Sequence, residues 1–300
     1  MKKRCALLLT LLTLLLVVGI PTGILVREYQ QEQRNRALIA AIHRNDDNAV
    51  LSLLLAGADA NTCQEDAPAP TIGQFLSQCF DRLRGKTKTH SGTPALLLAL
   101  AGVRFVYVNP AGYARGLTII KALLDHGARV DITDRDGTGL VYLAVEDYDS
   151  QILRLILQHR GNVDPHTSKS ASALLDWRFP PTGRTPLMMA SGWGDDKEID
   201  LLLGAGADID AQDDDGNTAL MYAIGKGRPE NIACLLAHHP NPKLKNASGN
   251  TALSQARASR ETNSITPFNH DADADFWPKI VTMLEQADKR EQTATHLHPR

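Results

Sequence analysis

The feature that most constrains the fold is a short pattern that recurs at one fixed spacing in residues 183–256. The segment TPLMMA at 185–190 returns as TALMYA at 218–223 and as TALSQA at 251–256, so each copy begins 33 residues after the previous one. A fixed period of this length is typical of stacked structural units, none of which can bury its own apolar face. The pattern therefore predicts a series of similar units packed one against the next.

Each unit carries the signals of two helices joined by a tight turn. The Thr185 hydroxyl can accept from a free N–H at the start of a helix, and Pro186 suits the next position because that N–H has no helical partner. Gly194 and Gly227 follow the first helix, where a left-handed turn favours glycine, and Asn45 takes this place in the first unit. The second helix has apolar residues at the i, i+3 and i+4 spacing of an amphipathic helix: Ile199, Leu202 and Leu203.

These motifs resemble the ankyrin repeat family, whose period is about 33 residues and whose signature is T-P-L-H-x-A. The resemblance covers about residues 36–288. It implies an all-α fold, an ankyrin-type α-solenoid of about six helix-turn-helix repeats with loop or helix insertions. The expected repeats are 36–61, 91–134, 135–164, 182–214, 215–247 and 248–288. The expected insertions are 62–90, 104–115, 165–181 and 261–275.

One position departs from the family signature in this chain. The signature histidine, which links neighbouring turns by hydrogen bonds in the family, is replaced in each copy of the motif. The residues that replace it are Leu97, Tyr142, Met188, Met221 and Ser254. The family's links between turns are therefore expected to be missing here, while the fold itself does not depend on them.

The N-terminal segment has the composition of a membrane anchor. Three basic residues precede an uncharged, mostly apolar run of 22 residues at 5–26, long enough at ~1.5 Å per residue to cross a hydrocarbon core of ~30 Å. We expect residues 1–4 to be a cytoplasmic basic end, 5–26 a transmembrane signal anchor, and 27–35 a helical stalk. The flanking charges place the repeats outside the cytoplasm, in the periplasm if the protein belongs to a bacterial inner membrane. The alternative is a signal peptide that is cleaved near Gly19, which would release the chain by secretion.

Charge and motifs narrow the possible functions. The formal net charge of −2 gives no electrostatic drive toward nucleic acid, and no nucleophile elbow, phosphate loop or zinc-protease motif is present. Asp271, Asp273 and Asp275 alternate as in a calcium loop, but Phe276 and Thr282 stand where that loop needs glycine and glutamate. The histidine pairs 238–239 and 296/298 do not fall at a metal-ligand spacing with carboxylates. We therefore expect no cofactor, no metal, no small-molecule substrate and no catalytic residue.

Residues 289–300 are expected to form a flexible tail.

The cysteines leave two alternatives open. Cys63 and Cys79 share the first insertion and are candidate disulfide partners if the repeats lie outside the cytoplasm. The alternative is two unrelated thiols, with Cys79 on the apolar face of a helix. Cys234 lies within an apolar helical segment and is expected to be a small buried side chain.

The family resemblance implies that the repeats bind another protein through a concave face made of finger tips and first helices. The candidate contact residues are Asp213 and Asp214 on a finger, and Tyr142, Met188, Trp193, Met221 and Tyr222 on or beside first helices. For Met188 and Met221, packing between repeats explains the side chain equally well. Trp193 is the strongest candidate because it stands between two glycines in a turn and because aromatic residues are typical binding anchors.

The leading hypothesis is a non-enzymatic interaction scaffold, tethered to a membrane, whose partner is another protein. One alternative is an enzyme whose site is built by the insertions between repeats. Another is an architectural protein that associates with copies of itself.

Overall fold

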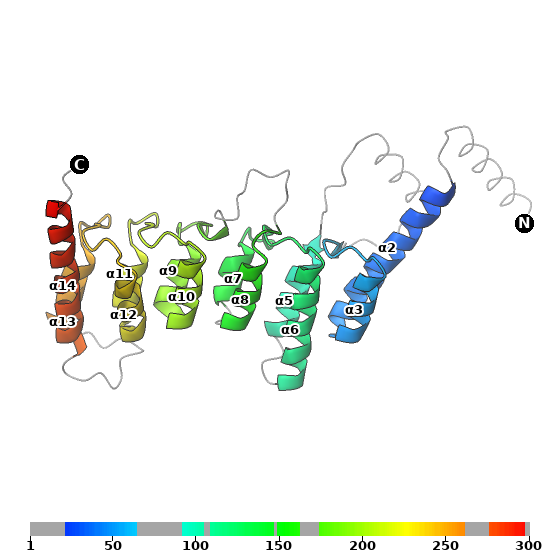
Figure 1. The fold of residues 1–300 in the computed structure, drawn as a ribbon, viewed down its shortest axis with the longest axis horizontal. Helices are drawn as coiled ribbons and strands as arrows, with labels where there is room; N and C mark the ends of the chain where they lie inside the picture. The colour runs from blue at the N-terminus through cyan, green and yellow to red at the C-terminus, as the bar shows by residue number, and fades with distance from the viewer. Residues whose placement is uncertain are drawn as a thin grey trace, which may run out of the picture. The chain divides into compact units, whose positions relative to one another are not determined.

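The structure is a computed structural model of the 300-residue chain, and it describes residues 22–64, 92–104, 109–146, 149–162, 174–261 and 276–297. The chain forms two compact units, Met1–Ala128 and Arg129–Arg300. The described residues form 12 helices and one pair of two-residue strands (Figure 1). The prediction of a mostly helical fold is confirmed, and the strand pair is an addition to it.

In unit 1 the described residues form two helix pairs and the strand pair. The helices are α2 (Thr22–His43), α3 (Asp47–Leu55), α5 (Ala95–Arg104) and α6 (Pro110–Asp125). Strand β1 (Cys63–Gln64) pairs antiparallel with β2 (Thr93–Pro94), so that Cys63 lies opposite Pro94. Asn45, between α2 and α3, has a left-handed φ of 52°, as expected for an asparagine in the place of a turn glycine.

The expected insertion at 104–115 differs from the structure in its second half. The Asn109 side chain accepts from the backbone N–H groups of Ala111 and Gly112, and Pro110 occupies the first turn of α6. This Asn-Pro start is a strong helix N-terminus, so α6 begins at Pro110 and runs for 16 residues. Residues 110–115 therefore lengthen the second helix of the repeat.

At the N-terminal end, the expected stalk and the first helix of the first repeat form one helix, α2. Most of the expected anchor, and the alternative cleavage point near Gly19, lie outside the described residues. Within the part of the chain that the structure describes, no helix is both long enough and apolar enough to span a membrane.

The described residues of unit 2 form four helix pairs. They are α7 (Leu140–Glu146) with α8 (Ser150–Gln158), α9 (Pro186–Trp193) with α10 (Asp196–Gly204), α11 (Ala219–Lys226) with α12 (Pro229–Ala237), and α13 (Ala252–Glu261) with α14 (Phe276–Leu297). The first helices contact one another in the order α7, α9, α11, α13, and the second helices in the order α8, α10, α12, α14 (Figure 1). The predicted helix pairs are therefore stacked in series within this unit.

The helix ends of unit 2 follow the sequence signals, with one exception. Thr185 and Thr218 each accept from the N–H three residues later, at 3.3 and 3.4 Å, and Gly227 has the left-handed φ of 63° that its position predicts. Gly194, in contrast, is extended with φ −79° and ψ −161°, so the prediction of a left-handed turn is wrong there. Glycine is needed at 194 for lack of space, because a Cβ atom would collide with the Glu198 carboxylate and approach the carbonyl oxygen of Ala190 to 2.9 Å.

The core lies between the helix layers. Ile199 and Leu202 of α10, like Ile232 and Leu235 of α12, have no exposed surface. The residues that replace the signature histidine in α7, α9 and α11 are also buried, at no more than 4% exposure: Tyr142, Met188 and Met221. These positions contribute apolar packing instead of a buried imidazole.

The fingers between repeats are joined by hydrogen bonds that do not need the missing histidine. The Ala247 N–H donates to the Asp215 carbonyl at 2.8 Å, and the Gln212 amide donates to the Lys245 carbonyl at 3.0 Å. The Asn246 amide donates to the Asn217 side-chain oxygen at 3.0 Å. Polar finger residues thus provide the links that the family's histidine supplies elsewhere.

Glu198 is a buried carboxyl group at the start of α10. Its backbone N–H donates to Asp195 Oδ1 at 2.9 Å, while its Oε2 accepts from the Asp195 N–H at 3.4 Å. The side chain is 1% exposed, and Oε1 has no hydrogen-bond partner among the described atoms. Burial, and then the charge of Asp195, raise the pKa of Glu198 to about 7.

The last helix covers the C-terminal end of the stack. α14 buries Trp277, Ile280 and Leu284 and is joined to α13 by an ion pair of 2.7 Å between Arg257 and Glu285. The helix continues to Leu297, so most of the expected flexible tail is helical. Residues 285–297 contain no glycine or proline, which explains why the helix does not end earlier. The acidic triplet at 271–275 lies outside the described residues.

Candidate functional site

Two aromatic rings and two cationic side chains meet where α9, α11 and a finger lie side by side in unit 2. We call this group the Trp193 cluster, and its members are Arg184, Trp193, Asp213, Tyr222 and Lys226. Arg184 precedes α9 and Trp193 ends it. Tyr222 and Lys226 lie four residues apart on α11 and therefore share one face of that helix. The cluster joins the fourth and fifth repeats.

Trp193 contacts neighbouring side chains on several sides but remains partly exposed. Its ring centroid lies 6.0 Å from that of Tyr222, with the planes tilted by 42°. Lys226 Nζ is 4.4 Å from the indole centroid and Arg184 Cζ is 5.6 Å from it, both within the range of cation–π attraction. Trp193 is thus the last residue of a helix, fixed by neighbours, with part of its surface open.

The Tyr222 hydroxyl connects the cluster to the finger. It donates to Asp213 Oδ2 at 2.6 Å and accepts from Arg184 Nε at 2.7 Å. Burial, together with the hydrogen bond to Asp213 and the charge of Asp213, raises the pKa of Tyr222 to about 12 against the opposing effect of Arg184. The phenol therefore stays protonated at neutral pH and acts as a bridge between two charges.

The Asp213 side chain stabilises the finger by hydrogen bonds to its backbone. Its Oδ1 accepts from the backbone N–H groups of Asp215 and Asn217 at 3.0 and 2.7 Å, and the residue is only 7% exposed. Asp214, at the tip, is exposed. Of the two predicted finger residues, Asp213 therefore holds the finger in shape and Asp214 is available for contact.

The other predicted contact residues do not reach the surface. Met188 and Met221 are buried between repeats, at 0% and 2% exposure. Tyr142 is 4% exposed and stacks on Phe179 of the third insertion with 5.1 Å between ring centroids. Trp177 of the same insertion lies against Tyr142, with 5.5 Å between the ring centroids. These three side chains contribute packing, and the surface that remains is centred on Trp193, Tyr222 and Asp214.

Two members of the cluster were not predicted from the sequence. The sequence does contain a signal for Lys226: it follows Tyr222 by four residues, and helical spacing places both side chains on the same face. Arg184 has none, because it lies 38 residues before Tyr222 in the chain and only the packing of α9 on α11 brings them together.

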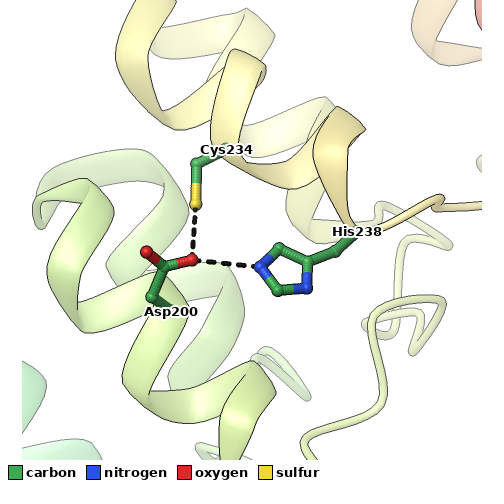
Figure 2. A group of neighbouring side chains, drawn as sticks. All are labelled: Asp200, Cys234 and His238. Atoms are coloured by element: carbon green, nitrogen blue, oxygen red, sulfur yellow. Dashed lines mark hydrogen bonds and ion pairs between the residues drawn. The ribbon is translucent and has the colours of Figure 1, made fainter.

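A second group of polar side chains lies on the second helices (Figure 2). Asp200 of α10 faces Cys234 of α12 and His238, which directly follows α12. Asp200 Oδ1 is 3.3 Å from Cys234 Sγ and 3.0 Å from His238 Nε2. Burial, followed by the hydrogen bond to Asp200 and the charge of Asp200, raises the pKa of Cys234 to about 12, while the hydrogen bonds from His238 and Cys234 lower the pKa of Asp200.

This group corrects two expectations. Cys234 is partly exposed and hydrogen-bonded, so its prediction as a buried apolar side chain is wrong. The sequence analysis finds no carboxylate at a ligand spacing from His238, because it compares only residues that are close along the chain. In the structure, Asp200 lies next to His238. The available signal was the i, i+4 spacing of Cys234 and His238, while Asp200 comes from the preceding repeat.

The predicted disulfide stays a prediction. Cys63 lies in β1 and is half-buried, with its Sγ 3.8 Å from the Asn61 carbonyl oxygen. Cys79 lies outside the described residues.

Comparisons with known proteins agree with this architecture. A family model described as ankyrin repeats (3 copies) matches residues 111–213 and 187–273, which together span more than half of the chain. The solved structure titled "Crystal Structure of EF0377 an Ankyrin Repeat Protein" is similar to this chain with a TM-score of 0.53 and 21% sequence identity, over 84% of this chain and 98% of that one. At this identity the likeness shows the fold alone. Ankyrin repeats generally mediate protein–protein interaction. The chain, with its stacked helix pairs and 33-residue period, belongs to the ankyrin repeat family.

Proposed function

We propose that the protein is a non-enzymatic interaction scaffold that binds a partner protein through the Trp193 cluster and the exposed finger residue Asp214. Residues 5–26 tether it to a membrane, with the repeats on the extracytoplasmic side. The observation that carries the binding proposal is the partly exposed Trp193 side chain, which is fixed by Tyr222, Arg184 and Lys226.

A fixed aromatic side chain is a favourable anchor for a partner. Binding orders less of the surface when the anchor is already held in one position, so less conformational entropy is lost. Tryptophan, tyrosine and arginine are also the residues that most often dominate binding energy at protein interfaces. The two cations beside the indole can pair with carboxylates on the partner, which gives the surface a preference for acidic segments.

The partner surface can be tested by photo-crosslinking in cells. A photoreactive amino acid replaces Lys226, in the cluster, and in a matched chain replaces Lys197, an exposed lysine of α10 in the same unit. We expect a discrete crosslinked product from position 226 and not from position 197. Adding Trp193→Ala should remove most of that product, because losing a central anchor of about 2 kcal/mol weakens binding roughly 30-fold. Equal products from both positions, or a yield that Trp193→Ala leaves unchanged, would contradict the proposal.

The membrane tether can be tested separately with a membrane-impermeant maleimide. A reporter cysteine is placed at Arg300 in a chain whose four native cysteines are replaced. We expect labelling of intact cells once any outer barrier is permeabilised. Protection until the cells are lysed would place the repeats in the cytoplasm and overturn the proposed orientation. It would also remove the reason to expect a disulfide between Cys63 and Cys79.

A further inference from the structure

The polar group on the second helices has the geometry of a metal site. The ligand atoms of Asp200, Cys234 and His238 all lie within 4.8 Å of one another, and they come from α10, from α12 and from the residue that directly follows α12 (Figure 2). We propose that these three side chains bind a divalent transition metal ion of the zinc type. The site is distinct from the Trp193 cluster, which lies on the first helices and a finger.

The distances agree with such an ion. Metal–ligand bonds of about 2.0–2.3 Å in a tetrahedral arrangement place the ligand atoms about 3.3–3.8 Å apart. Asp200 Oδ1 lies 3.3 Å from Cys234 Sγ, at the short end of this range, and 3.0 Å from His238 Nε2, slightly below it. The third pair, Cys234 Sγ and His238 Nε2, lies within 4.8 Å. Small side-chain rotations therefore create the space for an ion without a change in the backbone.

The ligand types select the class of metal. A thiolate, an imidazole and a carboxylate together suit zinc, cobalt or copper, whereas magnesium and calcium prefer oxygen ligands only. Three protein ligands leave a fourth tetrahedral position open. Because the side chains of Asp200 and His238 are 64% and 41% exposed, water or an external ligand can occupy that position.

The positions of the ligands also give the site a structural consequence. Cys234 and His238 are four residues apart and so project from one side of α12, opposite Asp200 on α10. A bound ion would join the second helices of two neighbouring repeats. Binding replaces the thiol S–H bond with a sulfur–metal bond and the proton passes to solvent, so no electron is transferred.

The test uses the full chain, purified in a mild detergent, stripped with EDTA and titrated with Co²⁺ followed by Zn²⁺. We expect one cobalt ion per chain, a thiolate-to-cobalt charge-transfer absorption, and its loss when zinc displaces cobalt. Zinc at a hundredfold excess over its dissociation constant should raise the melting temperature of unit 2 by about 5–10 °C.

The ligand variants are Cys234→Ser, His238→Asn and Asp200→Asn. Each should weaken binding at least tenfold, and Cys234→Ser should abolish the charge-transfer band. Matched controls are Cys63→Ser and His239→Asn, the latter at a left-handed position (φ 56°) that asparagine tolerates. The controls should bind like the unchanged chain.

Several results would overturn the proposal. They are no cobalt binding by the unchanged chain, a band that persists in Cys234→Ser, or equal losses in the ligand variants and the controls. Far-UV circular dichroism and tryptophan fluorescence establish that each variant is folded. If Cys234→Ser fails to fold, the cobalt affinity of Asp200→Asn tests the proposal in its place.

Discussion

Replacing Tyr222 by phenylalanine isolates the bridge between the Trp193 cluster and the finger. The change removes one oxygen atom and keeps the ring against Trp193. Asp213 Oδ2 then loses its 2.6 Å hydrogen bond and keeps only that from the Asn217 amide at 3.4 Å. Arg184 Nε loses its acceptor at 2.7 Å.

The expected cost follows from the charge and burial of the partners. Hydrogen bonds to charged groups contribute about 1.5–3 kcal/mol, more than those between neutral groups. Asp213 is 7% exposed, so water replaces the lost bond poorly. Arg184 is partly exposed, so water can solvate its guanidinium group. The loss of its hydrogen bond therefore adds little to the free-energy cost. We expect Tyr222→Phe to lower the free energy of unfolding of unit 2 by about 1.5–3 kcal/mol.

Urea unfolding followed by tryptophan fluorescence measures this change. All three tryptophans of the chain, Trp177, Trp193 and Trp277, belong to unit 2, so the signal reports that unit. A double-mutant cycle with Asp213→Asn should give a coupling energy of about 1–2 kcal/mol. A coupling energy below about 0.5 kcal/mol would refute the bridge, because the two groups would then act independently.

Three further predictions test the packing and electrostatics of the same unit. Leu202→Ala should lower the free energy of unfolding by about 2–5 kcal/mol because the side chain is fully buried, and urea unfolding that shows less than about 1 kcal/mol would contradict the assigned register. Gly194→Ala should lower the free energy of unfolding by about 1–3 kcal/mol, because its Cβ atom meets the Glu198 carboxylate and also the backbone of Ala190, which cannot move aside. Gly204→Ala, where a Cβ meets nothing within 4 Å, should be neutral or stabilising in the same assay. Glu198 has a folded-state pKa of about 7 against an ordinary value of 4.5, so between these pH values the folded state binds a proton that the unfolded state does not. The free energy of unfolding therefore falls as pH rises from 4.5 to above 7, by up to about 3 kcal/mol. Glu198→Gln cannot lose this proton, so its stability, measured in EDTA, should vary less across that range; an unchanged pH profile would show that another group is responsible.

The sequence predicted the features that depend on local spacing. The threonine caps and the apolar stripe of α10 each arise within a few neighbouring residues, and the 33-residue period is the recurrence of such local motifs along the chain. The structure has all three. Gly194 shows the limit of such reasoning. Glycine signals a special backbone position, but the sequence does not distinguish a left-handed turn from a site where a side chain across the turn leaves no room for Cβ.

The candidate sites could be predicted only in part, because their members come from different repeats. Trp193 was singled out by its own surroundings in the sequence, whereas Arg184 joins it through the packing of α9 on α11. Tyr142 is a predicted contact residue because the family resemblance places it on a first helix. The third insertion, however, places Phe179 and Trp177 over it, and an insertion's course cannot be deduced from a repeat pattern.

In the finger built on Asp213, the residues that hold the backbone in shape are different from those that are exposed to a partner. Asp213, Gly216 and Asn217 supply the hydrogen bonds and the left-handed φ of 75°, while Asp214 and Asp215 at the tip are exposed and enter the turn mainly through their backbone atoms. The same arrangement recurs 33 residues later, where Asn246 accepts from the N–H groups of Ser248 and Asn250. New tip side chains can therefore be exchanged for the present ones at little thermodynamic cost. Partner specificity can in this way diverge between otherwise equal scaffolds, and a designer could graft a chosen recognition loop onto 214–215 without rebuilding the stack.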